Sequence, residues 1–193
     1  MIKIFFSVFL LFVLSNLYSC SPSGVLASGG ATTMVVAEGD RSLGTVVDDA
    51  TIKINISSNL LSSSANLFVN INTNVIDGRV LLTGLVDTQE IRIEAVRKVW
   101  EVDGVKEVIN EIEIGNRTTI KEYANDLWIT TQVKGLAAKT IGLRALSYNF
   151  ETIKGKVYIA GITSRPEQLD QILEVTKTVK GVKEIINYVI IKE

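Results

Sequence analysis

The sequence has no histidine, a single cysteine and two prolines among its 193 residues. Without histidine, the chain lacks the usual general base near neutral pH, the Ser-His-Asp and Cys-His nucleophilic sites and the common zinc ligand sets. Its glycines do not follow the spacing of a dinucleotide-binding or phosphate-binding loop. The composition therefore argues against an enzyme, a metal site or a cofactor, and it favours a binding protein.

An excess of charge of one sign is also missing, since 20 basic residues face 21 acidic ones. Proteins that bind nucleic acid carry a concentrated basic footprint, so we expect no nucleic-acid partner. Beyond the N-terminal segment, no apolar run has the length of about 20 residues that a transmembrane helix needs. The rest of the chain suits one domain or two small ones.

The first 20 residues have the layout of a secretory signal that ends in a lipid-attachment site. Lys3 precedes an apolar run at residues 4–14 that is too short to span a membrane. The segment Leu17-Tyr18-Ser19-Cys20 is similar to the bacterial lipobox, which implies that residues 1–19 are removed and that Cys20 carries diacylglycerol. The alternative is an ordinary signal peptide with a chance cysteine.

The residues after the cysteine predict a location and a tether. Ser21 stands where an aspartate would hold a bacterial lipoprotein at the inner membrane, so the expected location is the periplasmic face of the outer membrane. Residues 20–45 are rich in Ser, Gly, Ala and Thr without a hydrophobic period, which predicts a flexible tether. A short apolar piece at residues 34–37 interrupts the tether and has no assigned role.

The remaining chain contains an internal repeat with a constant offset of 77 residues. Asp77–Gly84 (DGRVLLTG) corresponds to Lys154–Gly161 (KGKVYIAG), and Val102–Asn110 (VDGVKEVIN) corresponds to Val179–Asn187 (VKGVKEIIN). A register held this long indicates two copies of one unit. We place the copies at residues 46–114 and 123–193, with a linker at residues 115–122.

A first helix is predicted in each copy, because an apolar stripe at helical spacing follows residues that favour N-caps. Asp48 and Asp49 precede the stripe in the first copy, and Asn125 and Asp126 precede it in the second. The two stripes are Ile52, Ile56 and Leu60, and Ile129, Val133 and Ala137.

A hairpin follows the first helix. Residues 68–76 and 79–86 have the composition of strands, and Asp77-Gly78 between them suits a two-residue turn because both residues tolerate positive φ. Gly84 indicates a bulge or a close approach of a helix to the second strand.

A second helix and a third strand complete each copy. Residues 88–102 have a helical apolar pattern, with Thr88 as its expected cap and Gly104 as its expected end. In the second copy, Pro166 stands at the start of this helix. Residues 105–114 predict the third strand. The class is therefore α+β, with two αββαβ units, each a three-stranded mixed sheet with two helices on one face.

This pattern resembles the BON domain, whose motifs are D-G-x-V-x-L-x-G and G-V-x-x-V-x-N. They stand at Asp77–Gly84 and Gly104–Asn110 and recur at Lys154–Gly161 and Gly181–Asn187, with Lys154 where the family often has Asp or Asn. The lipobox, the tether and the tandem units together resemble the dual-BON outer-membrane lipoproteins of the DolP type. That resemblance implies phospholipid binding through the first helix of the second domain and a role in envelope integrity.

Comparison of the two copies draws attention to Trp128 on this helix. The first copy has Thr51 at the equivalent position, and it has Ala50 where the second copy has Leu127. At about 100° per residue, Trp128 lies about 140° from Val133, the centre of the buried stripe. Trp128 is therefore predicted to point away from the core of its own domain.

An outward tryptophan beside lysines is typical of a membrane interface, where the indole lies at headgroup depth and the lysines meet anionic phosphates. In the alternatives, Trp128 fills an interface between the two domains, docks an envelope protein such as an outer-membrane assembly factor, or has no role in a structural spacer. The role of Trp100 in the first copy stays open. The predicted site for anionic phospholipid consists of Trp128, Leu127, Thr131, Lys134 and Gly135.

Overall fold

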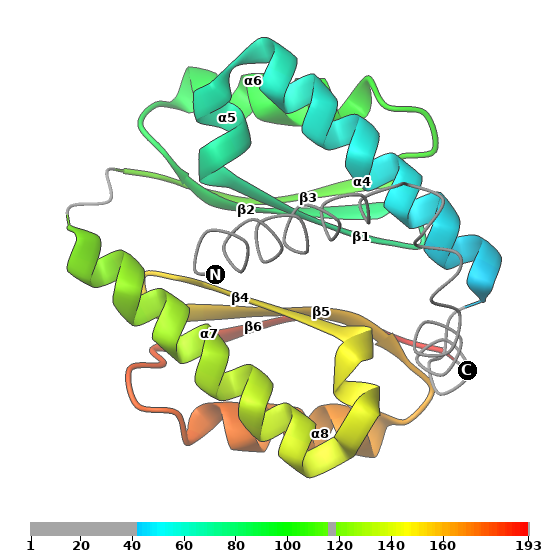
Figure 1. Cartoon of the computed structure of the whole chain (residues 1–193), viewed down its shortest axis with the longest axis vertical. Helices are drawn as coiled ribbons and strands as arrows, with labels where there is room; N and C mark the ends of the chain where they lie inside the picture. Colours follow the sequence, from blue (N-terminus) through cyan, green and yellow to red (C-terminus); the bar gives the residue numbers. More distant parts are fainter. Residues whose placement is uncertain (1–41, 116–118, 193) are drawn as a thin grey trace, which may run out of the picture. The chain divides into compact units, whose positions relative to one another are not determined.

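The computed structural model describes residues 42–115 and 119–192. They form two units, and in each unit helices cover one face of a three-stranded sheet (Figure 1). The predicted α+β class and αββαβ order are confirmed. Cys20, the predicted signal peptide, residues 34–37 and most of the predicted tether lie outside the described residues. None of the described helices combines the length and apolarity needed to cross a bilayer.

The first domain is built around a mixed sheet with β2 at its centre. Its elements are α4 (Leu43–Ser63), α5 (Ala65–Asn70), β1 (Ile71–Ile76), β2 (Arg79–Val86), α6 (Gln89–Trp100) and β3 (Glu107–Ile114). β1 pairs antiparallel with β2, and β3 pairs parallel with it. The parallel pairing follows because α6 carries the chain back across the sheet before β3 begins.

The second domain repeats this arrangement with β5 at the centre. Its elements are α7 (Ile120–Ile141), a 3-10 helix (Gly142–Ser147), β4 (Tyr148–Ile153), β5 (Lys156–Thr163), α8 (Pro166–Lys177) and β6 (Glu184–Ile191). The pairings match those of the first domain, antiparallel for β4 with β5 and parallel for β5 with β6. Pro166 begins α8 as predicted.

The first helix of each domain begins earlier than the sequence pattern suggested. Ser42 caps α4 and Thr119 caps α7, because their hydroxyls accept the backbone N–H three residues later. Residues 43–45, placed in the tether, and residues 120–122, placed in the linker, are therefore helical. The predicted caps at residues 48–49 and 125–126 are wrong.

The two aspartates among those predicted caps hold the hairpin turns instead. Asp49 is buried and accepts the backbone N–H groups of Asp77 and Gly78, both at 2.9 Å. Asp126 accepts the equivalent pair in the second domain at 2.8 and 2.9 Å. Both turns have positive φ at their two central residues, which confirms the predicted hairpin type. A buried carboxylate thus satisfies two backbone donors that would otherwise lack partners.

The first strand begins later than predicted, at Ile71 rather than residue 68, because the chain first forms the short helix α5. Its last residue, Asn70, lies against β2 at Gly84, where a Cβ atom would be 2.2 Å from the Asn70 carbonyl oxygen. The close helix approach predicted from Gly84 is confirmed.

The second helix is capped as predicted but ends differently. The Thr88 hydroxyl accepts the backbone N–H of Ile91, while α6 ends at the C-cap Glu101. Gly104 belongs to the following turn, with φ of 89°, and packs against Ile52 of α4. The position requires glycine for its backbone conformation rather than for helix termination.

Each domain has its own apolar core between the sheet and the helices. Both predicted stripes are buried there, with Ile56 of α4 and Val133 of α7 fully inaccessible to solvent. Such side chains stabilise a fold by about 1.5–3 kcal/mol each relative to exposure. The packing fixes the orientation of α4 and α7, and with it the faces that they leave to solvent.

A third apolar cluster contains residues from both sheets. In β5, Tyr158 and Ala160 belong to it, whereas Val157 and Ile159 belong to the core under the helices. Since neighbouring strand residues point to opposite faces, the cluster lies on the helix-free face. The first sheet contributes Ile76, Leu81 and Ile109.

Polar contacts accompany this cluster and also join the two domains. The Asn72 amide donates to Glu151 at 2.8 Å, and the Lys156 ammonium pairs with Glu113 at 2.9 Å. Directional contacts of this kind fix the register between two apolar surfaces more than they add stability, because partly exposed ion pairs contribute little.

Two tyrosines of this cluster predict a loss of stability at alkaline pH. Burial raises the pKa of Tyr188 to about 12, and its hydrogen bond to Glu111 adds to the shift. Burial, with the negative charge of Glu113 second, raises the pKa of Tyr158 further. An unfolded chain ionises its tyrosines near pH 10, so above that pH the unfolded state loses protons that the folded state keeps.

The free energy of unfolding of residues 40–193 should therefore fall as the pH rises through the range from about 10 to 12. Urea denaturation at a series of pH values measures this fall, and the double variant Tyr158→Phe, Tyr188→Phe should flatten it. An equal fall in the double variant would contradict the assignment.

Candidate functional site

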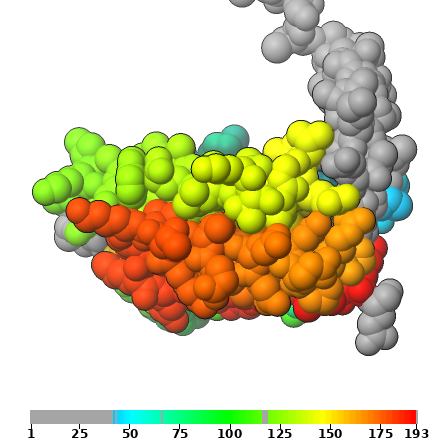
Figure 2. Space-filling model, turned by 90° about the horizontal axis from the view of Figure 1, so that it is seen from below, coloured from blue at the N-terminus to red at the C-terminus, as the bar shows by residue number. Residues whose placement is uncertain are grey.

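The side of α7 opposite the core is apolar and exposed. Trp128 is 46% exposed, and Leu127, Tyr123 and Ile120 are exposed with it. Figure 2 shows α7 and α8 side by side across one face of the second domain. We call the exposed stripe on the Trp128 side the α7 face, and it consists of Ile120, Leu127, Trp128, Thr131 and Gly135.

The first part of this face was not predicted from the sequence, because α7 begins before its predicted caps, at Ile120. Thr119 accepts the Glu122 backbone N–H at 3.2 Å, and the helix starts one residue after it, at Ile120. The signal was present, since Thr119-x-x-Glu122 matches the capping-box pattern. Recognising it would have added the exposed apolar residue Ile120 to the predicted site.

Lysines flank the α7 face. Lys121 and Lys139 lie within about 20° of Trp128 around the helix, and both are exposed. Lys134, a predicted site residue, lies about 120° away from Trp128 and lines a cleft of about 330 Å³ with Lys53 and Asn72 of the first domain. None of the three α7 lysines forms an ion pair with another described residue.

The small residues on the face leave its surface open around the tryptophan. The Thr131 hydroxyl donates to the Leu127 carbonyl at 2.8 Å, so its donor is satisfied within the helix. Gly135 is exposed, and a Cβ atom there would meet nothing within 4 Å. Four of the five predicted residues therefore share one face, and Lys134 stands apart at its edge.

The equivalent face of α4 lacks the tryptophan and the three lysines of α7. Seventy-seven residues before Leu127 and Trp128 stand Ala50 and Thr51, and Gly44 occupies the position of Lys121. The first domain does expose apolar residues, such as Ile54 and Val47. Its equivalents of the three α7 lysines are Gly44, Ser57 and Ser62.

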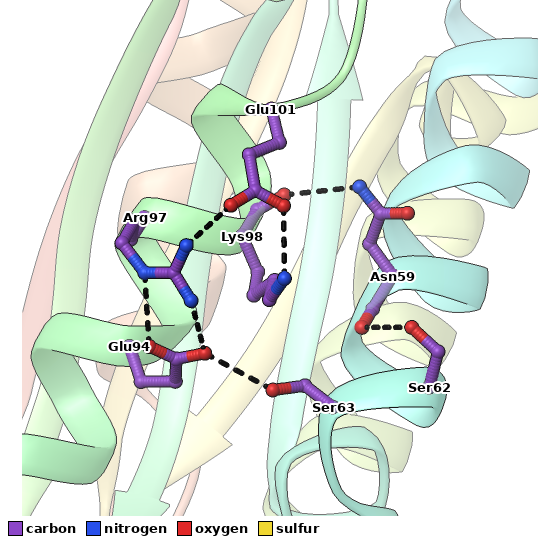
Figure 3. A network of polar contacts seen from close by, with 7 residues as sticks. All are labelled: Asn59, Ser62, Ser63, Glu94, Arg97, Lys98 and Glu101. Carbon is purple, nitrogen blue, oxygen red and sulfur yellow. Dashed lines mark hydrogen bonds and ion pairs between the residues drawn. The ribbon is translucent and has the colours of Figure 1, made fainter.

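Four charged residues on α6 and at its C-cap pair with one another in the first domain, as Figure 3 shows. Arg97 bonds Glu94 at 2.6 Å and Glu101 at 2.5 Å, and Lys98 bonds Glu101 at 2.9 Å. The bond from Arg97 lowers the pKa of Glu94, which also accepts from Ser63 at 3.1 Å. Cations held in this way are less available to an anionic ligand than the lysines of α7.

The BON-domain family model matches residues 48–116 and 125–193. The chain belongs to the BON-domain family. It is 39% identical to an uncharacterised protein of Anaplasma centrale, over 76% of this chain and 96% of that one. It is 34% identical to the 21 kDa hemolysin of Actinobacillus pleuropneumoniae, over 77% and 78%. The outer membrane lipoprotein DolP of Haemophilus influenzae is 28% identical over 82% of each chain.

The chain is thus a DolP-like protein of two BON domains, as its motifs indicated. Within the pair, Trp128 does not fill the contact between the domains, which the helix-free sheet faces form. Trp100, at the end of α6, is 52% exposed and is also outside that contact. The interface interpretation of Trp128 is therefore wrong.

Proposed function

We propose that this protein is a periplasmic lipoprotein, anchored to the outer membrane through Cys20, whose second BON domain binds anionic phospholipid through the α7 face. The proposed role is binding in support of envelope integrity, without catalysis. The similarity to a protein named outer membrane lipoprotein DolP supports the location, because it extends over 82% of each chain.

The observation that carries the proposal is the asymmetry between the two copies. Trp128 and Leu127 stay exposed on α7 beside lysines that form no ion pair in the part of the chain that the structure describes, whereas α4 has small residues at those positions. Inserting each large side chain at a membrane interface contributes up to about 1.5–3 kcal/mol. Each lysine near an anionic surface adds about 1 kcal/mol. Together these terms give a weak and selective membrane contact.

A weak contact suffices when the protein is already attached to the same membrane. A lipid on Cys20 would make the contact of the α7 face with the bilayer intramolecular, at an effective concentration in the millimolar range. The lipid anchor would thus supply location, and the α7 face would supply headgroup selectivity.

Co-sedimentation of residues 40–193 with vesicles tests the proposal without the lipid anchor. We expect binding to vesicles that contain phosphatidylglycerol and little binding to pure phosphatidylcholine. Trp128→Ala should weaken the binding by about 10-fold or more. Trp100→Ala is the matched control, because it removes an equally exposed tryptophan from the first domain.

Two results would count against the proposal. Equal losses in the Trp128 and Trp100 variants would show that exposed tryptophans act without regard to the α7 face. Absence of vesicle binding by the wild-type fragment would favour the alternative in which the protein is an adaptor and the α7 face docks an envelope protein.

A further inference from the structure

Each domain has a pocket where the first helix passes the hairpin turn. The pocket of the first domain has a volume of about 390 Å³, and that of the second has about 320 Å³. They occupy equivalent places, because Asp49 and Asp77 line the first pocket and Asp126 and Lys154, 77 residues later, line the second. The repeat thus provides an internal comparison of one pocket with two sets of side chains.

The charge of the pocket is reversed between the two domains. Four aspartates and one lysine carry the charge of the first pocket, whereas three lysines and two carboxylates carry that of the second. In the sequence, Lys180 also stands at the position of Asp103 of the first pocket. The first pocket holds Asp48, Asp49, Asp77, Asp103 and Lys106, and the second holds Lys121, Glu122, Asn125, Asp126, Lys154 and Lys183.

One ion pair of the first pocket becomes a pair of like charges in the second. Lys106 crosses the turn at Gly78 and bonds Asp77 at 3.0 Å. Lys183 crosses the equivalent turn at Gly155, but the residue at the position of Asp77 is Lys154. The second pocket therefore lacks the ion pair that neutralises the lysine of the first, and an anion bound there would supply the missing negative charge.

The three lysines outnumber the two carboxylates that line the same pocket. Both oxygens of Asp126 accept backbone N–H groups of the turn, and Glu122 contributes the other negative charge of the pocket. Lys154 is 3.9 Å from Glu113, which Lys156 already holds at 2.9 Å. Lys121 and Lys183 form no ion pair within residues 42–115 and 119–192.

The backbone conformation at this turn also disfavours lysine. Lys154 has φ of 52°, and Asp77 has φ of 54° at the equivalent position. Aspartate and asparagine adopt this left-handed conformation several-fold more readily than other residues with side chains. A residue that conflicts with both the local conformation and the local charge indicates a function rather than a structural role.

We infer that this pocket binds the phosphate of an anionic phospholipid headgroup, with Lys121, Lys154 and Lys183 as its cationic ligands. The inference rests on the proposed function and names the part of the second domain that would bind the headgroup. Lys121 and Asn125 precede Trp128 by seven and three residues on α7, so the pocket lies within about 10 Å of it along the helix. The α7 face and the pocket thus form neighbouring apolar and cationic parts of one contact.

The variant Lys154→Asp tests the inference with a residue that the protein already uses at this position of the turn. It reproduces Asp77, so Lys183 gains the ion pair that Lys106 has, and the fold should be kept. Its midpoint of thermal unfolding should be no lower than that of the wild type. We expect binding to phosphatidylglycerol vesicles to weaken by about 10- to 30-fold.

Lys177→Asp is the matched control, because it makes the same change of net charge on α8, where Lys177 is exposed and bonds Glu174. Its vesicle binding should stay within about 2-fold of the wild type. Equal losses in the two variants would overturn the inference in favour of a diffuse electrostatic attraction. Unchanged binding by Lys154→Asp would overturn it as well.

A second arm separates a lipid headgroup from free phosphate. Inorganic phosphate, titrated at constant ionic strength, should shift the backbone amide resonances of Lys154 and Gly155 only weakly, and phosphatidylglycerol in short-chain micelles should shift them at much lower concentration. Equal responses to the two probes would overturn the lipid assignment. Loss of vesicle binding in Trp128→Ala but not in Lys154→Asp would contradict the phosphate pocket and leave the proposed function intact. Absence of vesicle binding by the wild type would contradict both the pocket and the proposed function.

Discussion

Replacing Gly84 with alanine should destabilise the protein by about 4 kcal/mol, measured as the free energy of unfolding in urea. Gly84 has φ of 151°, which side-chain-bearing residues rarely adopt, and a Cβ atom there would lie 2.2 Å from the Asn70 carbonyl oxygen. The obstacle is backbone at the end of α5, so it cannot move aside as a side-chain end would. Strand β2 and α5 would have to separate, which opens the core of the first domain.

Gly135→Ala is the matched control for this prediction. Gly135 lies inside α7 with open space around its Cα, so alanine should stabilise the protein by about 0.5–1 kcal/mol through its helix propensity. The two glycine-to-alanine changes should therefore have opposite signs. A change below about 1 kcal/mol for Gly84→Ala would contradict the close approach between α5 and β2.

Replacing Ile153 with aspartate should cost about 3–5 kcal/mol, because it places an unpaired carboxylate in the apolar contact between the two sheets. Ile153 is 1% exposed and packs in the cluster with Tyr158 and Leu81. Ile153 lies in the apolar cluster between the two sheets, so charge at this position opposes the association of the two BON domains. We expect a lower urea midpoint and increased binding of a hydrophobic dye.

Ile54→Asp provides the control with the same chemical change at a surface position. Ile54 is 67% exposed on α4, so its replacement should change the free energy of unfolding by no more than about 0.5 kcal/mol. If the two variants lost stability equally, the loss would come from the added charge rather than from the contact between the sheets.

Several elements could be predicted from the sequence because short-range signals determine them. Asp77-Gly78 predicted the hairpin turn, since its type depends on two residues with positive φ. The stripes at Ile56 and Val133 predicted the buried sides of α4 and α7, since helical spacing alone places them on one face. The constant offset between the copies extended each prediction to the second domain.

The starts of the helices were mispredicted because several residue types favour an N-cap. Asp49 and Asp126 compete for that role with Ser42 and Thr119, and only the folded chain shows which of them meets the helix end. The aspartates serve a contact about 28 residues away, with the backbone of the hairpin turn. No local pattern could indicate a partner at that distance along the chain.

The sequence by itself determined the two-domain organisation, the αββαβ order and the outward direction of Trp128, because periodicity and repetition are properties of the chain alone. Tertiary structure decided which surface stays open. The two sheets cover each other's helix-free faces, so the α7 face remains exposed instead of filling the contact between domains. It also brought Lys121, Lys154 and Lys183 around one pocket, because charges far apart along a chain gather only where packing brings their elements together.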